Sequence, residues 1–466
     1  MTTLEATVGV RRYTVLAICC ASLLVSVMDI SIVNMALPAI RDDLGASTAG
    51  LQWTVDAYTL VLASFLLLAG STADRFGRKR MFRLGLIVFG LGSLLCSLAP
   101  TIEALVAARA VQAVGGTLLN PVAMAIVVTV FPDRAERARA IGIFGATAGL
   151  SLVLGPILGG ALVDSFGWRS VFWVNLPIIA LAVLFTSLYV PESRAARGRR
   201  FDPVGQLLVV LVLGSAVSAI IEQDAWRTPL IVTAAVAAVL LIAYERRREE
   251  PLLELRLFRS IPFSSAVVIA MVAYTGFGAF LFVTTLYLQS IRNLSALDAG
   301  LCLLPVGLLI TVLSPLTGRV VGARGPRLPL VVAGTALTLG AIASLGIGPA
   351  TPLPVVLGIF LLFGVFLGTI NPPIANSAVS GMPASMAGVA GSLASVGRQT
   401  GTSLGVAVAG SIIGTAAATP ADPQRFVHAE HIVWWPTVAI GHVVLALALF
   451  STSRRAHRTV QVDRNA

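Results

Sequence analysis

Apolar runs long enough to cross a lipid bilayer constrain this chain more than any other feature of its sequence. A bilayer core requires about 20 mostly apolar residues in a helix, and the sequence contains fourteen such runs. Their approximate bounds are 13–37, 51–73, 82–99, 102–130, 139–163, 170–190, 204–221, 229–244, 263–290, 299–321, 328–347, 353–374, 386–417 and 432–450. In lipid, a backbone outside a closed barrel satisfies its amides only as a helix. The sequence therefore predicts an all-α polytopic membrane protein with 14 transmembrane helices.

The composition agrees with a chain surrounded by lipid. Charged residues make up only 12% of the 466 residues, and the mean hydropathy is +0.89. A soluble chain has about a quarter of its residues charged, so a soluble enzyme and a disordered protein are both excluded. The four cysteines all lie within apolar runs, which favours buried free thiols over a disulfide framework or a paired-cysteine metal site.

The basic residues predict the orientation. A net charge of +11 would also suit a nucleic-acid-binding protein. With the N-terminus placed in the cytoplasm, however, 26 of the 33 Lys and Arg residues fall in cytoplasmic segments, five in outer loops and two within spans. This positive-inside bias explains the charge without nucleic acid. We expect a multi-pass protein of the cytoplasmic (inner) cell membrane with both termini cytoplasmic, the first run being retained rather than cleaved as a signal peptide.

Two weak internal repeats divide the chain. GSTADRFGRKR (70–80) follows the second run and GRVVGARGPRL (318–328) follows the tenth. GGTLLNP (115–121) lies in the fourth run and LGTINPP (367–373) in the twelfth. Because both pairs are separated by about 250 residues, they indicate two related halves, and repeats with a binding site between them are the usual build of secondary transporters.

The repeat predicts three structural units. These are an N-terminal six-helix bundle at 1–200, an inserted two-helix hairpin at 201–245 and a C-terminal six-helix bundle at 246–466. The hairpin is expected to begin with Asp202 as the N-cap and Pro203 as the first helical residue.

Two charges lie deep in predicted spans. Asp29 is about 12 Å from the outer end of the first span, and Arg109 is about 10 Å from the outer end of the fourth. A lone charge in hydrocarbon costs at least a few kcal/mol, so we expect both to face a shared water-filled cavity. Burial favours the neutral acid and a nearby arginine favours the carboxylate, which would allow Asp29 to load and release a proton. The alternative is a static ion pair that joins two helices.

The start of the second span carries three further candidates for binding a small-molecule substrate. Asp56 lies only five residues into the run, so it would either touch a cationic substrate or sit at the membrane interface. Trp53 and Tyr58 are on the same segment, and aromatic residues near a span end are more typical of interfacial anchoring than of substrate binding.

Five other residues are substrate-binding candidates with structural alternatives. Gln112 is one helical turn from the arginine of the fourth span, so it would orient the guanidinium, meet substrate or bond a neighbouring helix. Asn34 and Asn120 have the same alternatives. Tyr274 and Phe277 belong to an aromatic-rich ninth span, which would suit flat lipophilic cations or simply pack against lipid.

Six short motifs carry a resemblance to a known family. They are MDISIVNMALP (28–38), GSTADRFGRKR (70–80), RAVQAVGG (109–116), GLSLVLGPILGG (149–160), WRSVFWVNLP (168–177) and GRQTGTSLG (397–405). Together they resemble the major facilitator superfamily, in its fourteen-helix drug:proton antiporter branch of EmrB/QacA type, over nearly the whole chain. The departures are Ala113, where the family usually has Gly, and Gly322, where a repeated loop motif would carry Asp. The resemblance implies a major facilitator fold of two six-helix bundles plus two extra central helices.

The loop after the second span is implied by this resemblance to act as a gate. Its candidate residues are Gly70, Asp74, Arg75, Gly77 and Arg78. A carboxylate there would accept hydrogen bonds at a helix N-terminus, and the arginines would bridge to acidic residues of nearby loops. Positive-inside topology alone is the alternative, but it explains the arginines and not the aspartate.

The fifth span carries a second gating candidate. Gly155, Gly159 and Gly160 would let another backbone approach closely, and Pro156 would permit a bend. The link from this packing to antiport comes only from the resemblance.

No sequence signature of catalysis is present. The only lysine, Lys79, is followed by Arg80 rather than Ser or Thr, so there is no Walker A motif. Neither a catalytic triad nor a zinc signature occurs, and we expect no enzyme activity, no cofactor and no metal. The resemblance implies a proton-coupled antiporter that exports small lipophilic and often cationic drugs or antibiotics. We expect it to be monomeric. The alternatives are an exporter of one self-made antibiotic or metabolite, a nutrient symporter and a receptor that transports nothing.

Overall fold

The computed structural model describes residues 3–194, 202–222, 225–248, 251–380, 382, 386–416 and 423–453, and these are almost entirely helical, without a strand. The helices are α1 (Thr3–Leu44), α2 (Thr48–Phe76), α3 (Arg78–Ser97), α4 (Ile102–Val130), α5 (Arg134–Phe166), α6 (Ser170–Trp173), α7 (Asn175–Tyr189), α8 (Pro203–Ile221), α9 (Arg227–Glu245), α10 (Ile261–Leu286), α11 (Ala296–Arg324), α12 (Arg327–Ser344), α13 (Leu353–Val379), α14 (Ala387–Ala416) and α15 (Pro423–Ser451). Two short turns of other helical types, η1 (Leu255–Arg259) and η2 (Tyr287–Ile291), flank α10.

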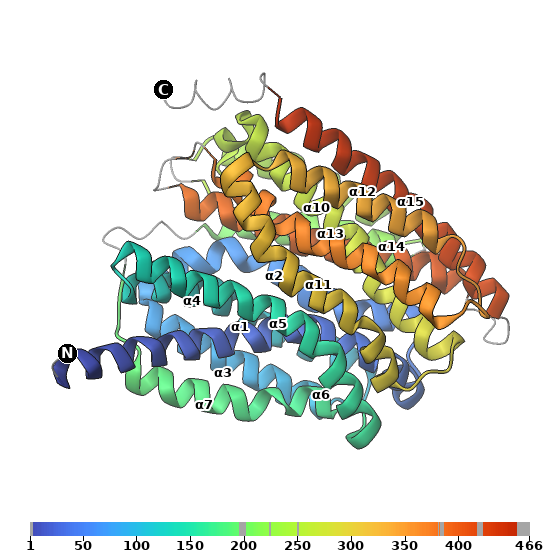
Figure 1. Cartoon of the computed structure of the whole chain (residues 1–466), viewed down its shortest axis with the longest axis horizontal. Helices are drawn as coiled ribbons and strands as arrows, with labels where there is room; N and C mark the ends of the chain where they lie inside the picture. The colour runs from blue at the N-terminus through green and yellow to red at the C-terminus, as the bar shows by residue number, and fades with distance from the viewer. Residues whose placement is uncertain are drawn as a thin grey trace.

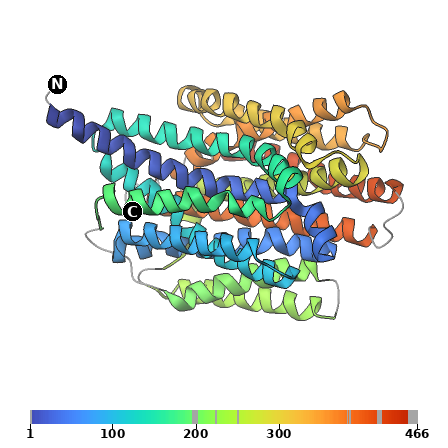
Figure 2. The same ribbon diagram turned by 90° about the horizontal axis from the view of Figure 1, so that it is seen from below.

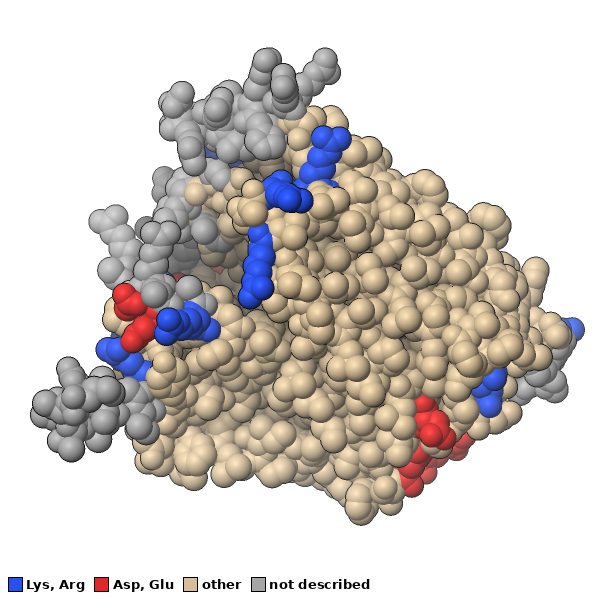
Figure 3. Space-filling model, viewed as in Figure 1, with Lys and Arg blue, Asp and Glu red and all other residues tan. Residues whose placement is uncertain are grey.

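The predicted membrane spans correspond to these helices. Within the described residues, thirteen helical segments are long and apolar enough to cross a bilayer, with α6 and α7 counted together. The remaining predicted run is α14, a helix of 30 residues that is rich in Gly, Ser and Thr and therefore less apolar than the others. Figure 3 shows charged side chains at the two ends of the molecule, with a broad uncharged band between them. Such a band fits a helical membrane protein.

Side-chain N-caps mark where several helices begin after short turns. Ser47, Thr101 and Ser295 begin α2, α4 and α11, each accepting a hydrogen bond from a backbone N–H of the first turn. Asp202 caps α8 in the same way, with Pro203 as the first helical residue, as predicted. These caps satisfy N–H groups that would otherwise lack a partner.

The helices form two groups that lie side by side (Figure 1). In the first, α4 packs against α1, α2 and α3, while α1 also packs against α5 and α7. In the second, α10 packs against α13, α14 and α15, while α12 packs against α13 and α15 and α11 packs against α13. We call α1–α7 the first half and α10–α15 the second half. The proposed domain limits at 201 and 245 agree with these groups but remain a prediction.

The hairpin α8–α9 lies on one side of the bundle, as the yellow-green pair in Figure 2 shows. Only α8 contributes substantial packing, against α2 of the first half and α14 of the second. Val239 on α9 is 67% exposed, which suits a lipid-facing helix. The hairpin therefore covers the line where the two halves meet rather than extending either half.

The two halves touch at one end of the bundle and separate toward the other. We call the end that bears the turns at 45–47, 98–101 and 292–295 the distal end, and the opposite end, where the N-terminus lies, the termini end (Figure 1). Contact across the halves is made by α5 with α11 and by α2 with α14.

Glycines along α5 and α11 show where the two halves lie close together. Toward the distal end, a Cβ on Gly160 or Gly300 would come within 2.3 Å of a backbone oxygen of the other half. Toward the termini end, Gly145 of α5 and Gly318 of α11 have no such atom within 4 Å. The structure is thus closed at the distal end and open at the termini end.

Candidate functional site

The most constrained polar cluster surrounds the Asp29–Arg109 pair within the first half. Arg109 Nη1 donates a hydrogen bond to Asp29 Oδ2, and the side chains are 1% and 0% exposed. Arg109 Nε also donates to the backbone carbonyl of Thr54, at 3.0 Å. The guanidinium lies over the Tyr58 ring, 4.3 Å from its centroid. Helices α1, α2 and α4 therefore hold one ion pair in a fixed geometry.

Amide side chains complete this cluster. Gln112 Nε2 donates to Asp29 Oδ1 at 2.9 Å, while Gln112 Oε1 accepts from Arg109 Nη1 at 2.6 Å. Asn175 at the start of α7 donates to Asp29 Oδ1 at 3.4 Å and to Ser93 Oγ of α3 at 3.0 Å. The groups bonded to the Asp29 carboxylate are all donors, which is the arrangement that an ionised carboxylate requires. Gln112 acts here by orienting both members of the ion pair.

The prediction that both charges face a shared water-filled cavity is wrong for this conformation. The two residues do meet, as their equal depth indicated, but close packing around them excludes solvent. Tyr58 was also misplaced: it is 0% exposed, donates to the backbone carbonyl of Ser26 at 3.3 Å and covers Arg109. It is a component of the buried cluster and not an interfacial aromatic residue.

Asp56 occupies a second buried position, between the two halves. It is 0% exposed, and its Oδ1 accepts a hydrogen bond of 2.8 Å from Ser403 of α14. Its Oδ2 has no hydrogen-bond partner among the described residues. One turn earlier, Gln52 Nε2 donates to the backbone carbonyl of Ala407 at 2.7 Å. Of the two alternatives for Asp56, the interface position is contradicted by this burial, because the residue belongs to the contact between α2 and α14. Substrate binding by Asp56 stays a prediction.

Trp53 joins α2 to the hairpin. Its indole Nε1 donates to Glu222 just after α8, at 3.2 Å, and its ring packs beside Val217 and Ile221. This is a structural contact of a partly buried side chain, and it differs from the free interfacial position that was expected.

The two predicted asparagines each have an unsatisfied oxygen. Asn34 Nδ2 donates to the backbone carbonyl of Ile30 at 2.8 Å, while its buried Oδ1 has no partner among the described residues. Asn120 Oδ1 is also buried without such a partner. These atoms remain candidates for binding substrate, because a buried acceptor left unpaired is costly.

Tyr274 and Phe277 of the second half pack edge to face, with their ring centroids 5.6 Å apart. Tyr274 Oη donates to Asn371 Oδ1 of α13 at 2.8 Å. Arg398 of α14 lies near Tyr274 and donates to the side chain of Ser395 at 2.6 Å.

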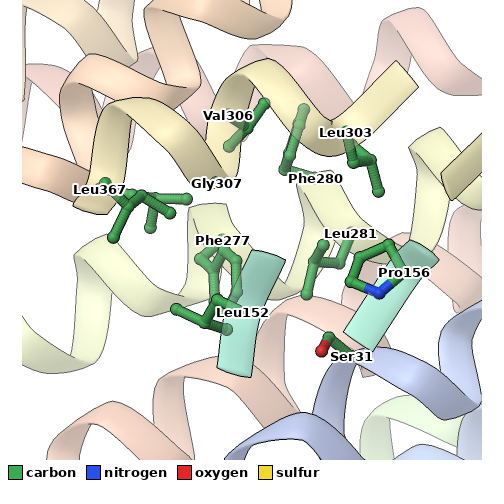
Figure 4. Close-up of a pocket in the computed structure, with 11 residues that line it drawn as sticks. Ser31, Leu152, Pro156, Phe277, Phe280, Leu281, Leu303, Val306, Gly307 and Leu367 are labelled. Carbon is green, nitrogen blue, oxygen red and sulfur yellow. The ribbon is translucent and has the colours of Figure 1, made fainter. Parts of the chain in front are cut away.

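Phe277 also borders a small apolar cavity between the halves (Figure 4). The cavity measures about 20 Å³, room for about one water molecule. Ser31 and Pro156 line it from the first half, and Phe280 and Leu303 from the second. A drug-sized molecule would require the halves to move apart here.

The glycines of the fifth span make the close approaches that were predicted. A Cβ on Gly155 would overlap Ser31 Oγ, and one on Gly159 would come within 2.7 Å of Ile32. Gly160 lies against the backbone of Ala296 at the start of α11. Pro156 lies inside α5, with its carbonyl against Gly300. The motif thus packs α5 against α1 and against the other half.

At the junction of α2 and α3, Asp74 in the last turn of α2 pairs with Arg78, the first residue of α3, at 2.9 Å. Arg78 also donates to Thr129 of α4 at 2.7 Å. The expectation that Asp74 lies at a helix N-terminus is wrong, because the carboxylate in that position is Glu192, whose Oε1 accepts from the backbone N–H of Lys79 at 3.1 Å.

The remaining predicted gating residues near the junction of α2 and α3 have the following surroundings. Gly77 has φ 107°, and a Cβ there would lie 2.6 Å from Glu192 Oε1. Arg75 lies over the ring of Phe76, and Gly70 has open space around it. None of the contacts described for this loop reaches the second half, so gating by it remains a prediction.

Sequence reasoning missed several partners. Asn175 lies within WRSVFWVNLP (168–177), a segment that had been noted only for its resemblance. Ser403 lies within GRQTGTSLG (397–405), a segment likewise noted only for its resemblance. Ser93 and Glu192 had no recognisable signal, because short hydroxyl and loop carboxyl groups are common in such chains. Asp164, which bonds the start of α11, could have been found as an acid at the end of the fifth span.

Comparison with known proteins adds an independent finding. The sequence profile described as Major Facilitator Superfamily matches residues 19–406. The chain is 36% identical to multidrug resistance protein Stp of Mycobacterium tuberculosis (strain CDC 1551 / Oshkosh) over 436 residues, covering 92% of this chain and 80% of the relative.

Two further relatives come from Streptomyces. Puromycin resistance protein pur8 of Streptomyces alboniger is 36% identical, with 88% of this chain and 84% of the relative covered. The tetracenomycin C resistance and export protein of Streptomyces glaucescens is 34% identical, with 86% and 75% covered. Among solved structures, a D-xylose-proton symporter matches 95% of this chain and 97% of its own, with a TM-score of 0.68 at 14% identity, which is a likeness of fold.

Proposed function

The chain belongs to the major facilitator superfamily, and from this premise we propose that it exports small lipophilic drugs or antibiotics across the cytoplasmic membrane in exchange for protons. The observation that carries the proposal is the buried Asp29–Arg109 pair within the first half. Intramembrane ion pairs are expensive, and in transporters they mark ion pathways. The names of the relatives, which are multidrug and antibiotic resistance proteins, supply the class of substrate.

In the proposed cycle, Asp29 carries the proton. With the distal end closed, its carboxylate is held by Arg109, Gln112 and Asn175. Opening of the distal end would admit water to this cluster, and protonation of Asp29 would remove the charge that attracts the guanidinium. The packing of α1 against α2 and α4 would then change, because Arg109 must find other acceptors.

Asp56 is proposed to respond to the same movement. Its bond to Ser403 joins α2 to α14, so it breaks when the halves separate at the distal end. Its second oxygen lacks a partner, and an unpaired buried charge is costly. Asp56 is therefore a second candidate for binding a proton or a cationic group of the substrate.

The orientation is proposed from charge. The termini end carries most of the basic residues of the sequence, so the positive-inside rule places it in the cytoplasm. The open end of the bundle would then face the cytoplasm, from which an exporter loads its substrate.

A dedicated exporter of one self-made antibiotic is the second candidate function. It is favoured by the relative from Streptomyces glaucescens that is named for resistance to and export of tetracenomycin C. Drug susceptibility across many compounds separates the two candidates, because a dedicated exporter protects against one chemical family.

The test is a susceptibility panel in an efflux-deficient host, run with the wild type and Asp29→Asn. The wild type should protect against lipophilic drugs, and everted vesicles acidified inside should lose part of their pH gradient when such a drug is added. Asp29→Asn should insert normally and do neither. Wild-type export by the variant between about pH 6 and pH 8, a range in which a normal carboxylate stays ionised, would remove Asp29 from the coupling role.

A further inference from the structure

We propose that Arg398, Tyr274 and Asn371 form a subsite that binds an acidic oxygen group of the exported molecule, such as a carboxylate, phenolate or enolate. The inference rests on the proposed export function and specifies its substrate class. It favours acids and polyphenols over the permanent cations that the aromatic residues alone suggested.

Close packing of α10 against α14 brings the subsite together. A Cβ on Gly401 of α14 would come within 2.0 Å of the Met271 carbonyl, and one on Gly405 within 2.1 Å of the Thr275 carbonyl. Such contacts exist only where both helix backbones touch. They place Arg398, one turn before Gly401, beside Tyr274 on α10.

Within the part of the chain that the structure describes, no acidic residue balances the charge of Arg398. Among the described residues no carboxylate lies within 4 Å of its guanidinium, and its side-chain bond goes to the neutral Ser395. The side chain is neither fully buried nor exposed. Arg109 is the opposite case, since it is 1% exposed and paired with Asp29. A guanidinium in the interior of a membrane bundle requires a partner, and an anionic group of the substrate would supply it.

The acids of neighbouring helices do not fill this role. Asp29 already neutralises Arg109, and Asp56 is sealed at its contact with Ser403. The groups that the structure records near Arg398 are instead the neutral side chains of Ser395 and Tyr274. The Tyr274 hydroxyl donates to Asn371 Oδ1, which leaves the Asn371 amide Nδ2 as a further donor. A guanidinium with an amide donor nearby suits a charged or electron-rich oxygen.

The depth of the subsite fits a binding position. Arg398 lies about 16 Å into α14 and Tyr274 about 20 Å into α10, counted from the termini end, which is near the middle of a bilayer core of about 30 Å. Substrate sites of secondary transporters lie near the midplane, between the repeats.

The surroundings of the subsite predict a ligand with one acidic part and one apolar part. Phe277, one turn beyond Tyr274, borders the apolar cavity between the halves, and its ring points into it (Figure 4). An acidic group at Arg398 would thus leave an apolar or aromatic ring system to occupy the space beside Phe277 once the halves move. The geometry points to an aromatic or polyketide-like acid as the substrate class.

A pair of dyes with the same xanthene ring system tests the charge preference. Fluorescein carries a carboxylate and a phenolate, whereas rhodamine 123 is an esterified cation. Binding to the full-length protein in lipid nanodiscs is measured by fluorescence anisotropy. The wild type should bind fluorescein more tightly than rhodamine 123, and Arg398→Gln should weaken fluorescein binding about tenfold or more, as expected for a lost charged hydrogen bond. Rhodamine 123 should be unaffected or bind more tightly.

Three further variants sharpen the result. Arg398→Lys keeps the charge with fewer donors and should lose only part of the affinity. Asn371→Leu should weaken the binding of fluorescein and leave the binding of rhodamine 123 unchanged. Arg324→Gln, an exposed arginine in the last turn of α11, is the matched control and should change neither. If Arg398→Gln does not fold, as judged by gel filtration and thermal unfolding, the proposal is tested by the affinities of Arg398→Lys and Asn371→Leu for the two dyes.

An equal loss of affinity for both dyes in a folded Arg398→Gln protein would overturn the proposal. So would a wild type that binds rhodamine 123 more tightly than fluorescein or that binds no fluorescein at all. These outcomes are separate from the export test. Fluorescein binding that depends on Arg398, in a protein that gives no drug resistance, would sink the export proposal and leave the subsite standing. Drug resistance in a protein whose fluorescein binding does not depend on Arg398 would overturn the subsite and leave the export proposal standing.

Discussion

Asp164, near the end of α5, accepts a hydrogen bond from the backbone N–H of Ala296 at the start of α11, with Oδ1 and the nitrogen 3.1 Å apart. Its other oxygen accepts from the N–H of Leu297 at 2.9 Å. The carboxylate therefore caps a helix of the other half, where the helix dipole favours a negative charge. This bond joins the two halves directly at the distal end.

Asp164→Ala should favour opening of the distal end. Loss of an anionic cap costs about 0.5–2 kcal/mol, so the equilibrium between the two states should move by up to roughly thirtyfold. Labelling of a cysteine introduced at Leu303 with an impermeant maleimide, in a background without the native cysteines, measures this opening. Asp43→Ala is the control, because Asp43 pairs with Arg169 inside the first half. Similar labelling of both variants would show that Asp164 is not a latch.

Gly160→Ala should also open the distal end, for a steric reason. The new methyl group would lie 2.3 Å from the carbonyl oxygen of Ala296, so α5 and α11 must separate. Gly145→Ala adds the same atom in open space on the same helix and should be tolerated. We expect drug export to fall in the first variant and to persist in the second at equal expression. Full activity of Gly160→Ala would mean that this contact relaxes without cost.

Arg109→Ala should destabilise the protein far more than Arg398→Ala. Removal of Arg109 leaves the buried Asp29 charge without its cation, which typically costs about 3–5 kcal/mol. Removal of Arg398 leaves no such acid among the residues that the structure describes. In thermal unfolding in detergent, the melting temperature should fall clearly for Arg109→Ala only. The double variant of Arg109→Ala with Asp29→Asn should recover part of the lost melting temperature. The absence of any recovery would argue against the ion pair as the cause.

Asp74→Ala should alter the balance between the two states more than it alters substrate affinity. The change frees Arg78, which then retains only its bond to Thr129 across to α4. Asp74 lies at the termini end, far along α2 from Asp56, so no contact with a central substrate is lost. Cysteine accessibility from each side and equilibrium drug binding check this. Strongly weakened binding with an unchanged accessibility pattern would place Asp74 in the binding site instead.

Depth along a helix could be predicted from the sequence, because each residue advances a helix by a fixed rise. The apolar runs predicted the helices, and Asp202 with Pro203 predicted where α8 begins. The same counting placed Asp29 and Arg109 at one depth, and they are indeed paired.

The neighbours of a side chain were decided only by the tertiary structure. Asp56 meets Ser403, 347 residues away, and Glu192 rather than Asp74 occupies the start of α3. The rotation of a helix about its axis depends on how every adjacent surface packs, and no local pattern encodes it. For that reason the depth of the charges followed from the sequence, whereas their burial and their partners required the folded bundle.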